Sequence, residues 1–325
     1  MNKLKIIPIL LSIQVLFFIN LSYAQTHNYP NKIIRIVIPY PTGGSADGLM
    51  RPIAKRMSEI LGQPVIIDNR VGANGIIGAD AVAKSPPDGY TILMGAIGPN
   101  SVAALMQQLP YDPVKDFAPL AFLAAVSNVL VVNASSSIKS VPDLIQQAKA
   151  KPGQLTYGST GNGSSNHLAA ELLKLSSGLD ITHVPYKGGA AMQTDLIGGH
   201  ISILFDNLPA ALSQIRSGVF RPIAVTSLKR QADIPDVPTM DELGFSKFET
   251  GAWYGLFLPA GTPKNIIDQI NSVVNKSISE AALRDRFRSQ GFDLNPMTAD
   301  QFSEFVSTET LKWRKVIYSA GIKPQ

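Results

Sequence analysis

Short β-branched runs alternate with helix-period segments along most of the chain. Residues 33–38 form an apolar run that suits a strand buried on both faces, and apolar residues then recur at helical spacing over 49–60 until Gly62. The other predicted strands are 65–67, 90–94, 117–132, 155–157, 182–184, 201–205 and 222–226. The other predicted helices are 76–84, 141–150, 166–175, 190–197, 209–216, 263–280 and 299–319. Such alternation predicts an α/β fold with a mostly parallel sheet.

The N-terminal segment has the pattern of a secretory signal. Lys3 and Lys5 precede an apolar run over 6–21, and the small residues Ser22 and Ala24 follow it. This pattern predicts a signal peptide, residues 1–24, cleaved after Ala24, and therefore an exported, soluble mature chain. The alternative is an uncleaved membrane anchor, because the apolar run is near the lower length limit for spanning.

Composition removes several classes of chemistry. The 325 residues include no cysteine, so disulfides, thiolate zinc sites, iron–sulfur clusters and a cysteine nucleophile are excluded. Four well-separated histidines form no local metal pair. The formal net charge of +5 is spread thinly, which argues against a nucleic-acid surface. The length suits two lobes, which we expect to be joined by crossing strands.

Four predicted strand-to-helix loops are rich in small and polar residues: 41–45, 158–165, 186–189 and 205–207. A helix starts with unpaired backbone N–H groups and the positive end of its dipole, and glycine lets a ligand approach that backbone closely. In open α/β sheets such loops gather at the carboxyl ends of the strands. Together they predict a cleft for a small anion.

Other interpretations of these loops lack their defining residues. The dinucleotide, P-loop and serine-hydrolase signatures are absent from the sequence. His167 and Glu171 have i, i+4 spacing, but a local hydrogen bond or a place beside the cleft suits His167 better than a metal. Asp47 suits either a helix-terminal or a cleft position. Asp206 suits either a ligand ammonium or neighbouring N–H groups. Trp253 and Tyr254 are expected to pack at a hinge or in the core.

The motifs, in their order along the chain, are similar to one family. They are 39–47, 68–79, 87–91, 158–164, 167–168, 184–188, 205–206, 235–239 and 253–256. Over essentially the whole mature chain, the sequence resembles the extracytoplasmic solute receptors of the tripartite tricarboxylate transporter family, often called Bug receptors. Thr42 and Val71 stand where proline is common in that family, and Asn74 stands where glycine is common.

The resemblance implies a periplasmic-binding-protein-like fold of type II, with two α/β lobes, mostly parallel central sheets and a ligand cleft between them. We expect lobe 1 to comprise 25–125 and 250–325, and lobe 2 to comprise 126–249. The expected function is capture of a small organic carboxylate or amino acid in the periplasm and delivery to the membrane subunits of a transporter. No enzymatic activity, cofactor, metal or nucleic-acid partner is expected, and the expected state is a monomer.

The expected ligand-binding residues lie in or beside these four loops: Tyr40, Thr42, Gly43, Gly44, Ser45, Asp47, Ser159, Thr160, Asn162, Ser164, His167, Lys187, Gly188 and Asp206. The alternative function is an exported hydrolase or lyase acting on a small carboxylate, with His167, Lys187 and Asp206 as acid–base groups. A receptor that signals through a sensor kinase is a third hypothesis, which this sequence does not test.

Overall fold

Within residues 29–319, which the computed structural model describes, ten strands form one hydrogen-bonded sheet. The strands are β1 (Ile34–Ile38), β2 (Val65–Asn69), β3 (Thr91–Ala96), β4 (Phe117–Asn133), β5 (Thr156–Ser159), β6 (Thr182–Pro185), β7 (Ile203–Asn207), β8 (Phe220–Val225), β9 (Gly251–Pro259) and β10 (Asp293–Leu294). Their order is β2-β1-β3-β9-β4-β7-β5-β6, with β8 and β10 also paired to β4. The predicted signal peptide, residues 1–24, lies outside the described residues.

Helices connect most of these strands. They are α2 (Ser45–Leu61), η2 (Ala73–Gly75), α3 (Ile76–Ala83), η3 (Gly98–Val102), α4 (Ala103–Met106), α5 (Val141–Ala150), α6 (Ser165–Ser177), α7 (Gly189–Ile197), α8 (Leu208–Arg216), α9 (Lys264–Ser279), α10 (Ala281–Arg288) and α11 (Ala299–Ser319). None of the described helices is both long enough and apolar enough to cross a membrane.

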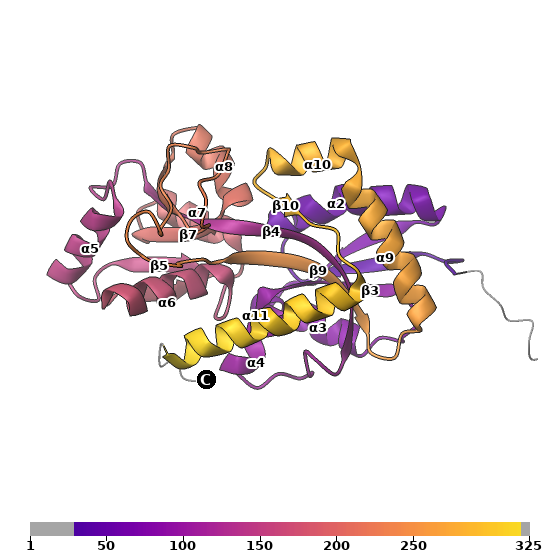
Figure 1. Ribbon diagram of the computed structural model, residues 1–325. Coiled ribbons are helices and arrows are strands. Elements are labelled where there is room, and N and C mark those ends of the chain that lie inside the picture. Colours follow the sequence, from indigo (N-terminus) through magenta and orange to yellow (C-terminus); the bar gives the residue numbers. More distant parts are fainter. Residues whose placement is uncertain (1–28, 320–325) are drawn as a thin grey trace, which may run out of the picture. The chain divides into compact units, whose positions relative to one another are not determined.

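Two long strands, β4 and β9, run between two groups of elements (Figure 1). Residues 117–127 of β4 pair with β9, and from Asn128 onward β4 pairs with β7 and β8. Each antiparallel ladder among the described strands includes β4 or β9, whereas β1–β2, β1–β3, β5–β6 and β5–β7 are parallel. We call β1, β2, β3, β9 and β10, with the loops and helices that follow them, the β1 group, and β5, β6, β7 and β8, with the loops and helices that follow them, the β5 group.

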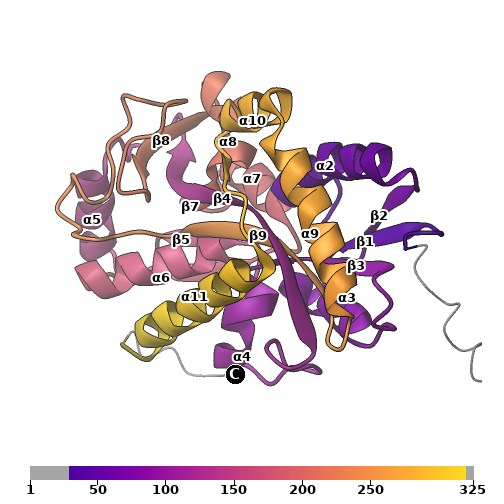
Figure 2. The same cartoon turned by 45° about the vertical axis from the view of Figure 1, so that its right-hand side comes forward.

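In the β5 group, alternate residues of each strand face different helices. Leu130 and Phe205 pack with α5 and α6, whereas their neighbours Val129 and Leu204 pack with α7 and α8. This two-residue period places one pair of helices on each face of the sheet, and Figure 2 shows α5 and α6 away from α7 and α8. The strands are therefore buried on both faces, as their continuous apolar sequences predict.

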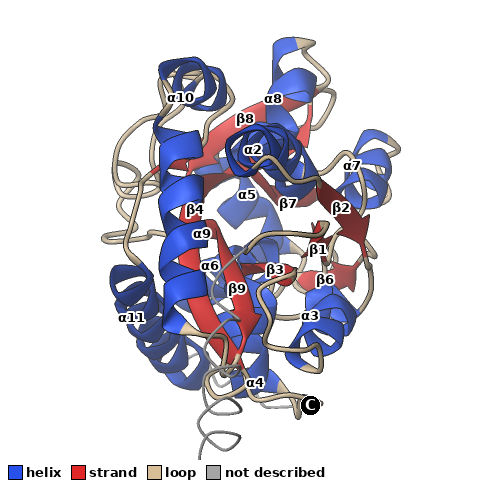
Figure 3. Ribbon diagram, turned by 90° about the vertical axis from the view of Figure 1, so that its right-hand side faces the viewer, coloured by secondary structure: helices blue, strands red, loops and turns tan. Residues whose placement is uncertain are grey.

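In the β1 group, aromatic side chains fill the space between the sheet and α11. Trp253, Phe257 and Phe302 contact one another at ring-centroid distances of 5.1–6.4 Å. A Cβ at Gly255 would overlap the Phe302 ring, so glycine is required for this approach. Helix α9 contacts β4 and α2 (Figure 3).

The predicted α/β class is confirmed, and each predicted strand and helix is present. Their ends are shifted by at most two residues, except that α2 begins at Ser45, four residues before the predicted start of that helix. The sequence reasoning assigned no element to β9, α10 or β10. The two glycines within β9 interrupt its strand pattern, and α10 buries only Phe287, so it shows no apolar period.

Candidate functional site

The loop between β1 and α2 supplies exposed backbone at the start of a helix. Thr42, Gly43 and Gly44 are exposed, and α2 begins after Gly44 with no side-chain cap. Its first N–H groups are therefore not occupied by a capping side chain within the described part of the chain.

Asp47, predicted as a ligand residue, is buried and bonded within this region. Its carboxylate accepts hydrogen bonds from Gly43 N at 3.0 Å, Arg51 Nε at 2.8 Å and Asn69 Nδ2 at 3.2 Å. Burial opposes ionisation, but the hydrogen bonds from Arg51, Gly43 and Asn69 outweigh it and hold the pKa of Asp47 below its ordinary value. Asp47 thus fixes the shape of the loop. Tyr40 also contributes to it, because its carbonyl accepts a hydrogen bond from Asn69 Nδ2 at 3.0 Å.

The loop between β5 and α6 is held by its own polar side chains. Ser159 is fully buried, and its Oγ accepts a hydrogen bond from Gly161 N at 3.0 Å and lies 2.6 Å from His183 Nε2. Ser164 caps α6 by accepting a hydrogen bond from His167 N. Thr160 donates to Asn166 Oδ1 at 3.1 Å. These hydroxyls therefore shape the loop.

The loop between β6 and α7 meets the loop between β1 and α2. A Cβ at Gly188 would lie 2.9 Å from Pro41 Cγ, so the two backbones approach closely. Lys187 is exposed, and α7 starts after Gly188 without a side-chain cap among the described residues. The starts of α2 and α7 are thus neighbouring regions of positive helix dipole.

The loop after β7 carries a buried carboxylate. Asp206 is 1% exposed and accepts hydrogen bonds from Gln193 Nε2 at 2.6 Å and Asn207 N at 2.8 Å. Burial raises the pKa of Asp206 from 3.8 to about 6, and these two bonds only partly offset it. This carboxyl group therefore changes its protonation state around pH 6.

Tyr254 of β9 joins the loops of the two groups. Its hydroxyl accepts a hydrogen bond from Asn207 Nδ2 at 3.2 Å and is hydrogen-bonded to the Ser45 side chain. Burial raises the pKa of Tyr254 above its ordinary value, so the hydroxyl stays neutral. The sequence reasoning assigned this residue to packing and did not include it among the ligand residues.

Asn74 makes a second connection between the groups. Its Nδ2 donates to the carbonyl of Asn162 at 2.9 Å, and a Cβ at Gly161 would lie 3.2 Å from the Asn74 Cβ. The sequence signal was its position in a glycine-rich loop where the resembled family commonly has glycine. The structure thus joins residues of all four predicted loops, by direct packing or through hydrogen bonds.

His167 hydrogen-bonds locally. Its Nδ1 accepts from Gly163 N at 3.4 Å, and its ring lies 4.5 Å from that of His183 between centroids. Burial, followed by the proximity of His183, lowers the pKa of His167 to about 4. Within residues 29–319, no three metal-ligating side chains of His, Asp or Glu lie close enough together to hold an ion.

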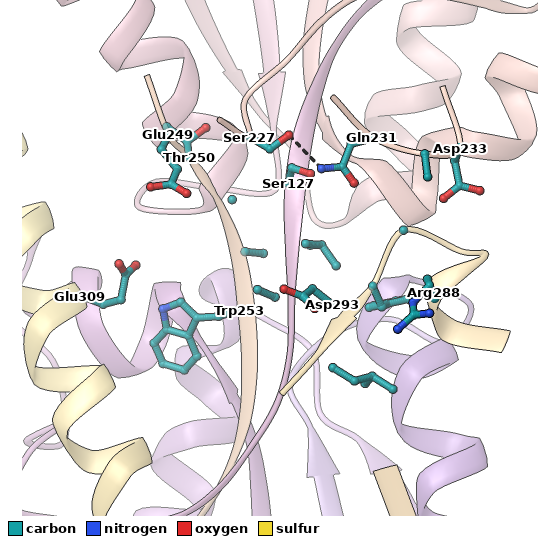
Figure 4. Close-up of a pocket in the computed structure, with 18 of the residues that line it drawn as sticks. Ser127, Ser227, Gln231, Asp233, Glu249, Thr250, Trp253, Arg288, Asp293 and Glu309 are labelled. Atoms are coloured by element: carbon teal, nitrogen blue, oxygen red, sulfur yellow. Dashed lines mark hydrogen bonds between the residues drawn. The ribbon is translucent and has the colours of Figure 1, made fainter. Parts of the chain in front are cut away.

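A separate groove of about 600 Å³ lies along β4 and β9 (Figure 4). Its walls include Gln231, Glu249, Arg288 and Glu309, and Trp253 lies at its edge. Its lining within the described chain includes none of the predicted ligand residues. The groove and the convergent loops are therefore different regions of the molecule.

Comparison with known proteins gives a consistent family match. The model of the tripartite tricarboxylate transporter family receptor matches residues 49–322. Protein BugT of Bordetella pertussis is 38% identical over 297 residues, which cover 91% of each chain.

Solved structures match over the same extent. R. palustris Rpa4515 with adipate has a TM-score of 0.89 and 38% identity, covering 92% of this chain and 100% of that one. MatC from Rhodopseudomonas palustris with bound malate has a TM-score of 0.85 and 29% identity, covering 89% of this chain and 100% of that one. The alkanesulfonate-binding protein SsuA from Xanthomonas axonopodis, at 13% identity and a TM-score of 0.58, shares the fold.

Proposed function

Since this chain belongs to the receptor family of tripartite tricarboxylate transporters, and is therefore a solute-binding receptor, we propose that it binds a small dicarboxylate at the four convergent loops. The observation that carries the proposal is the close approach of two uncapped helix starts, those of α2 and α7, at the contact of Gly188 with Pro41. Backbone N–H groups at such ends favour a carboxylate.

The side chains support binding through backbone groups. Ser159 and Asp47 already use their polar atoms within their loops, and Lys187 is the exposed cation of the predicted set. A carboxylate would therefore be held mainly by N–H groups and by bridging water, which loses little enthalpy relative to direct contact. The related proteins with adipate and malate support dicarboxylates as the ligand class.

The two groups of strands support the proposed lobes, with 25–125 and 250–325 as lobe 1 and 126–249 as lobe 2. Pairing of β4 changes from β9 to β7 and β8 at residues 127–128, close to the proposed boundary. Rotation about β4 and β9 would open and close the loops around the ligand. The hydrogen bonds of Asn74 with Asn162 and of Tyr254 with Asn207 would then form on closure.

We place the mature protein in the periplasm as a monomer, after removal of residues 1–24. A related solved structure is the periplasmic binding protein BugD, at 30% identity. The liganded receptor would dock on the membrane subunits of its transporter. The proposed role is binding without bond chemistry, as the receptor family supports. Of the three alternative acid–base groups, His167 is bonded to Gly163 and Asp206 to Gln193.

A charge placed at the start of α2 tests the ligand site. Gly44→Asp should leave folding unharmed, because aspartate is a favourable N-cap. Its carboxylate at about 4 Å from a bound carboxylate would cost about 4 kcal/mol at a surface-like dielectric, which is a loss of about 1,000-fold in affinity. Calorimetry with adipate and malate, guided by native mass spectrometry of any co-purified acid, measures this loss.

The control variant is Ser140→Asp, which puts the same charge at the N-cap of α5, a helix that contributes none of the four loops. It should bind like the wild type. Equal binding by Gly44→Asp and wild type would refute the proposed site, and turnover of the bound acid would refute the receptor role.

A further inference from the structure

Two histidines contact the loop between β5 and α6. His167 lies in the first turn of α6 and His183 lies on β6. The ring of His183 stacks on that of Tyr157 at 4.9 Å between centroids, and the two imidazoles are 4.5 Å apart. Packing therefore fixes both rings against the loop.

The contacts fit both imidazoles as acceptors. Ser159 Oγ accepts from Gly161 N and lies 2.6 Å from His183 Nε2, and with Nε2 as the acceptor the hydroxyl proton also has a partner. His167 Nδ1 accepts the N–H of Gly163 at 3.4 Å. Each bond requires a lone pair on the ring nitrogen, and a protonated imidazole has none to offer.

We propose that His167 and His183 are positioning residues that hold the 159–164 loop as paired hydrogen-bond acceptors, and that carboxylate binding requires both rings to be neutral. The inference rests on the proposed function, because it assigns the residues that shape one of the ligand loops. Neither histidine needs to touch the ligand, since His183 acts through Ser159 and His167 acts through the backbone of Gly163.

The charged groups around the rings are compatible with neutral imidazoles. Glu171, the acidic group nearest the pair, is bonded to Lys174 Nζ at 2.8 Å and to the Tyr157 hydroxyl at 2.6 Å. Burial is the largest cause that lowers the pKa of each histidine to about 4, while Glu171 partly opposes it and Lys174 adds to it. Both rings are therefore neutral at ordinary pH.

The loop that the pair holds is also the one that contacts the β1 group. Gly161 donates to Ser159, which contacts His183, and Gly161 also packs against Asn74. The carbonyl of the next residue, Asn162, accepts a hydrogen bond from the Asn74 amide. Displacing the loop by even a fraction of an ångström would therefore disturb both the ligand N–H groups and this link.

The first test needs no ligand. Nitrogen-15 NMR of the unliganded protein at pH 7 should show His183 protonated on Nδ1 with a free lone pair on Nε2, and His167 protonated on Nε2 with a lone pair on Nδ1. The opposite tautomer at either residue, or a charged ring, overturns the proposal whether or not the carboxylate function holds.

The second test uses adipate binding by calorimetry. His183→Leu should weaken binding at least tenfold, whereas His183→Gln, which keeps an acceptor, should stay within about threefold of the wild type. In a Ser159→Ala background the leucine change should add little, because the same bond is already lost. The exposed His200, changed to Gln, is the control and should bind normally.

Equal losses in the leucine and glutamine variants, or additive losses with Ser159→Ala, would show that His183 acts only through packing and would overturn the proposal. Failure of the wild type to bind adipate would count against this ligand class, and the tautomers then decide the inference by themselves.

Discussion

The buried carboxyl group of Asp206 should reduce the stability of the folded protein at neutral pH. Asp206 is 1% exposed and is bonded to one amide side chain, that of Gln193, and to the N–H of Asn207, with no cation among its hydrogen-bond partners in the described chain. Replacing it by asparagine keeps the shape and removes the charge, but asparagine has one acceptor oxygen and keeps only one of the two hydrogen bonds. We therefore expect the stability of Asp206→Asn relative to the wild type to rise as the pH passes through 6.

The size of the effect follows from the pKa. Burial raises the pKa of Asp206 from 3.8 to about 6, and one pKa unit corresponds to about 1.36 kcal/mol, so the ionised group costs about 3 kcal/mol of folding free energy. A raised carboxyl pKa means that the stability contribution is complete below pH 3.8 and is lost as the pH rises through 6. The stability of Asp206→Asn relative to the wild type should therefore rise by about 3 kcal/mol between pH 3.5 and pH 7.5.

Urea unfolding of the wild type and Asp206→Asn at several pH values between 3.5 and 7.5 gives this difference directly, because effects of the other titrating groups cancel. Asp236→Asn, at an exposed position, controls for the loss of one negative charge. A difference that does not change with pH, or one that shifts toward the wild type as the pH rises, would show that the Asp206 carboxylate is not penalised by burial.

Three further predictions concern the hydrogen bonds of Tyr254, the packing at Gly255 and the titration of His167. Tyr254→Phe removes the hydroxyl bonded to the starts of both α2 and α8, and calorimetry with adipate should show about a tenfold weaker affinity, equivalent to about 1.4 kcal/mol. Gly255→Ala forces a methyl group into the Phe302 ring and should lower the thermal midpoint, whereas Gly48→Ala, in open space on α2, should raise it through a gain of about 0.5–1 kcal/mol. The pKa of about 4 for His167 predicts stability that is complete above pH 6.5 and is lost as the pH falls toward 4, and urea unfolding of His167→Gln should lack this loss.

The sequence predicted most of the fold because strands buried on both faces are continuous apolar runs. The predicted helices 141–150 and 299–319 agree with α5 and α11 at both ends. Ser140 caps α5, and apolar spacing defines α11. Strand β9 was missed because Gly255, required by the approach of Phe302, breaks the strand pattern locally. The glycine is required by a contact with a residue far along the chain, and the neighbouring sequence does not indicate that contact.

The candidate site was predictable to the level of its loops but not of its hydrogen bonds. Composition indicated which loops start helices, and the structure connects them. Sequence could not assign the Ser159 hydroxyl to His183, because the two residues are 24 positions apart and meet only through the pairing of β5 with β6. Similarly, the Tyr254 links to Ser45 and Asn207 arise from strand crossing, so sequence indicated only burial for this tyrosine.

The most direct test of the central claim is a crystal structure of the protein with a carboxylate that it binds in solution. The claim predicts that the carboxylate oxygens accept hydrogen bonds, directly or through water, from the backbone N–H groups at the start of α2 and from those of the 159–164 loop or the start of α7. A carboxylate bound instead in the groove beside Trp253, with those helix starts unoccupied, would contradict it.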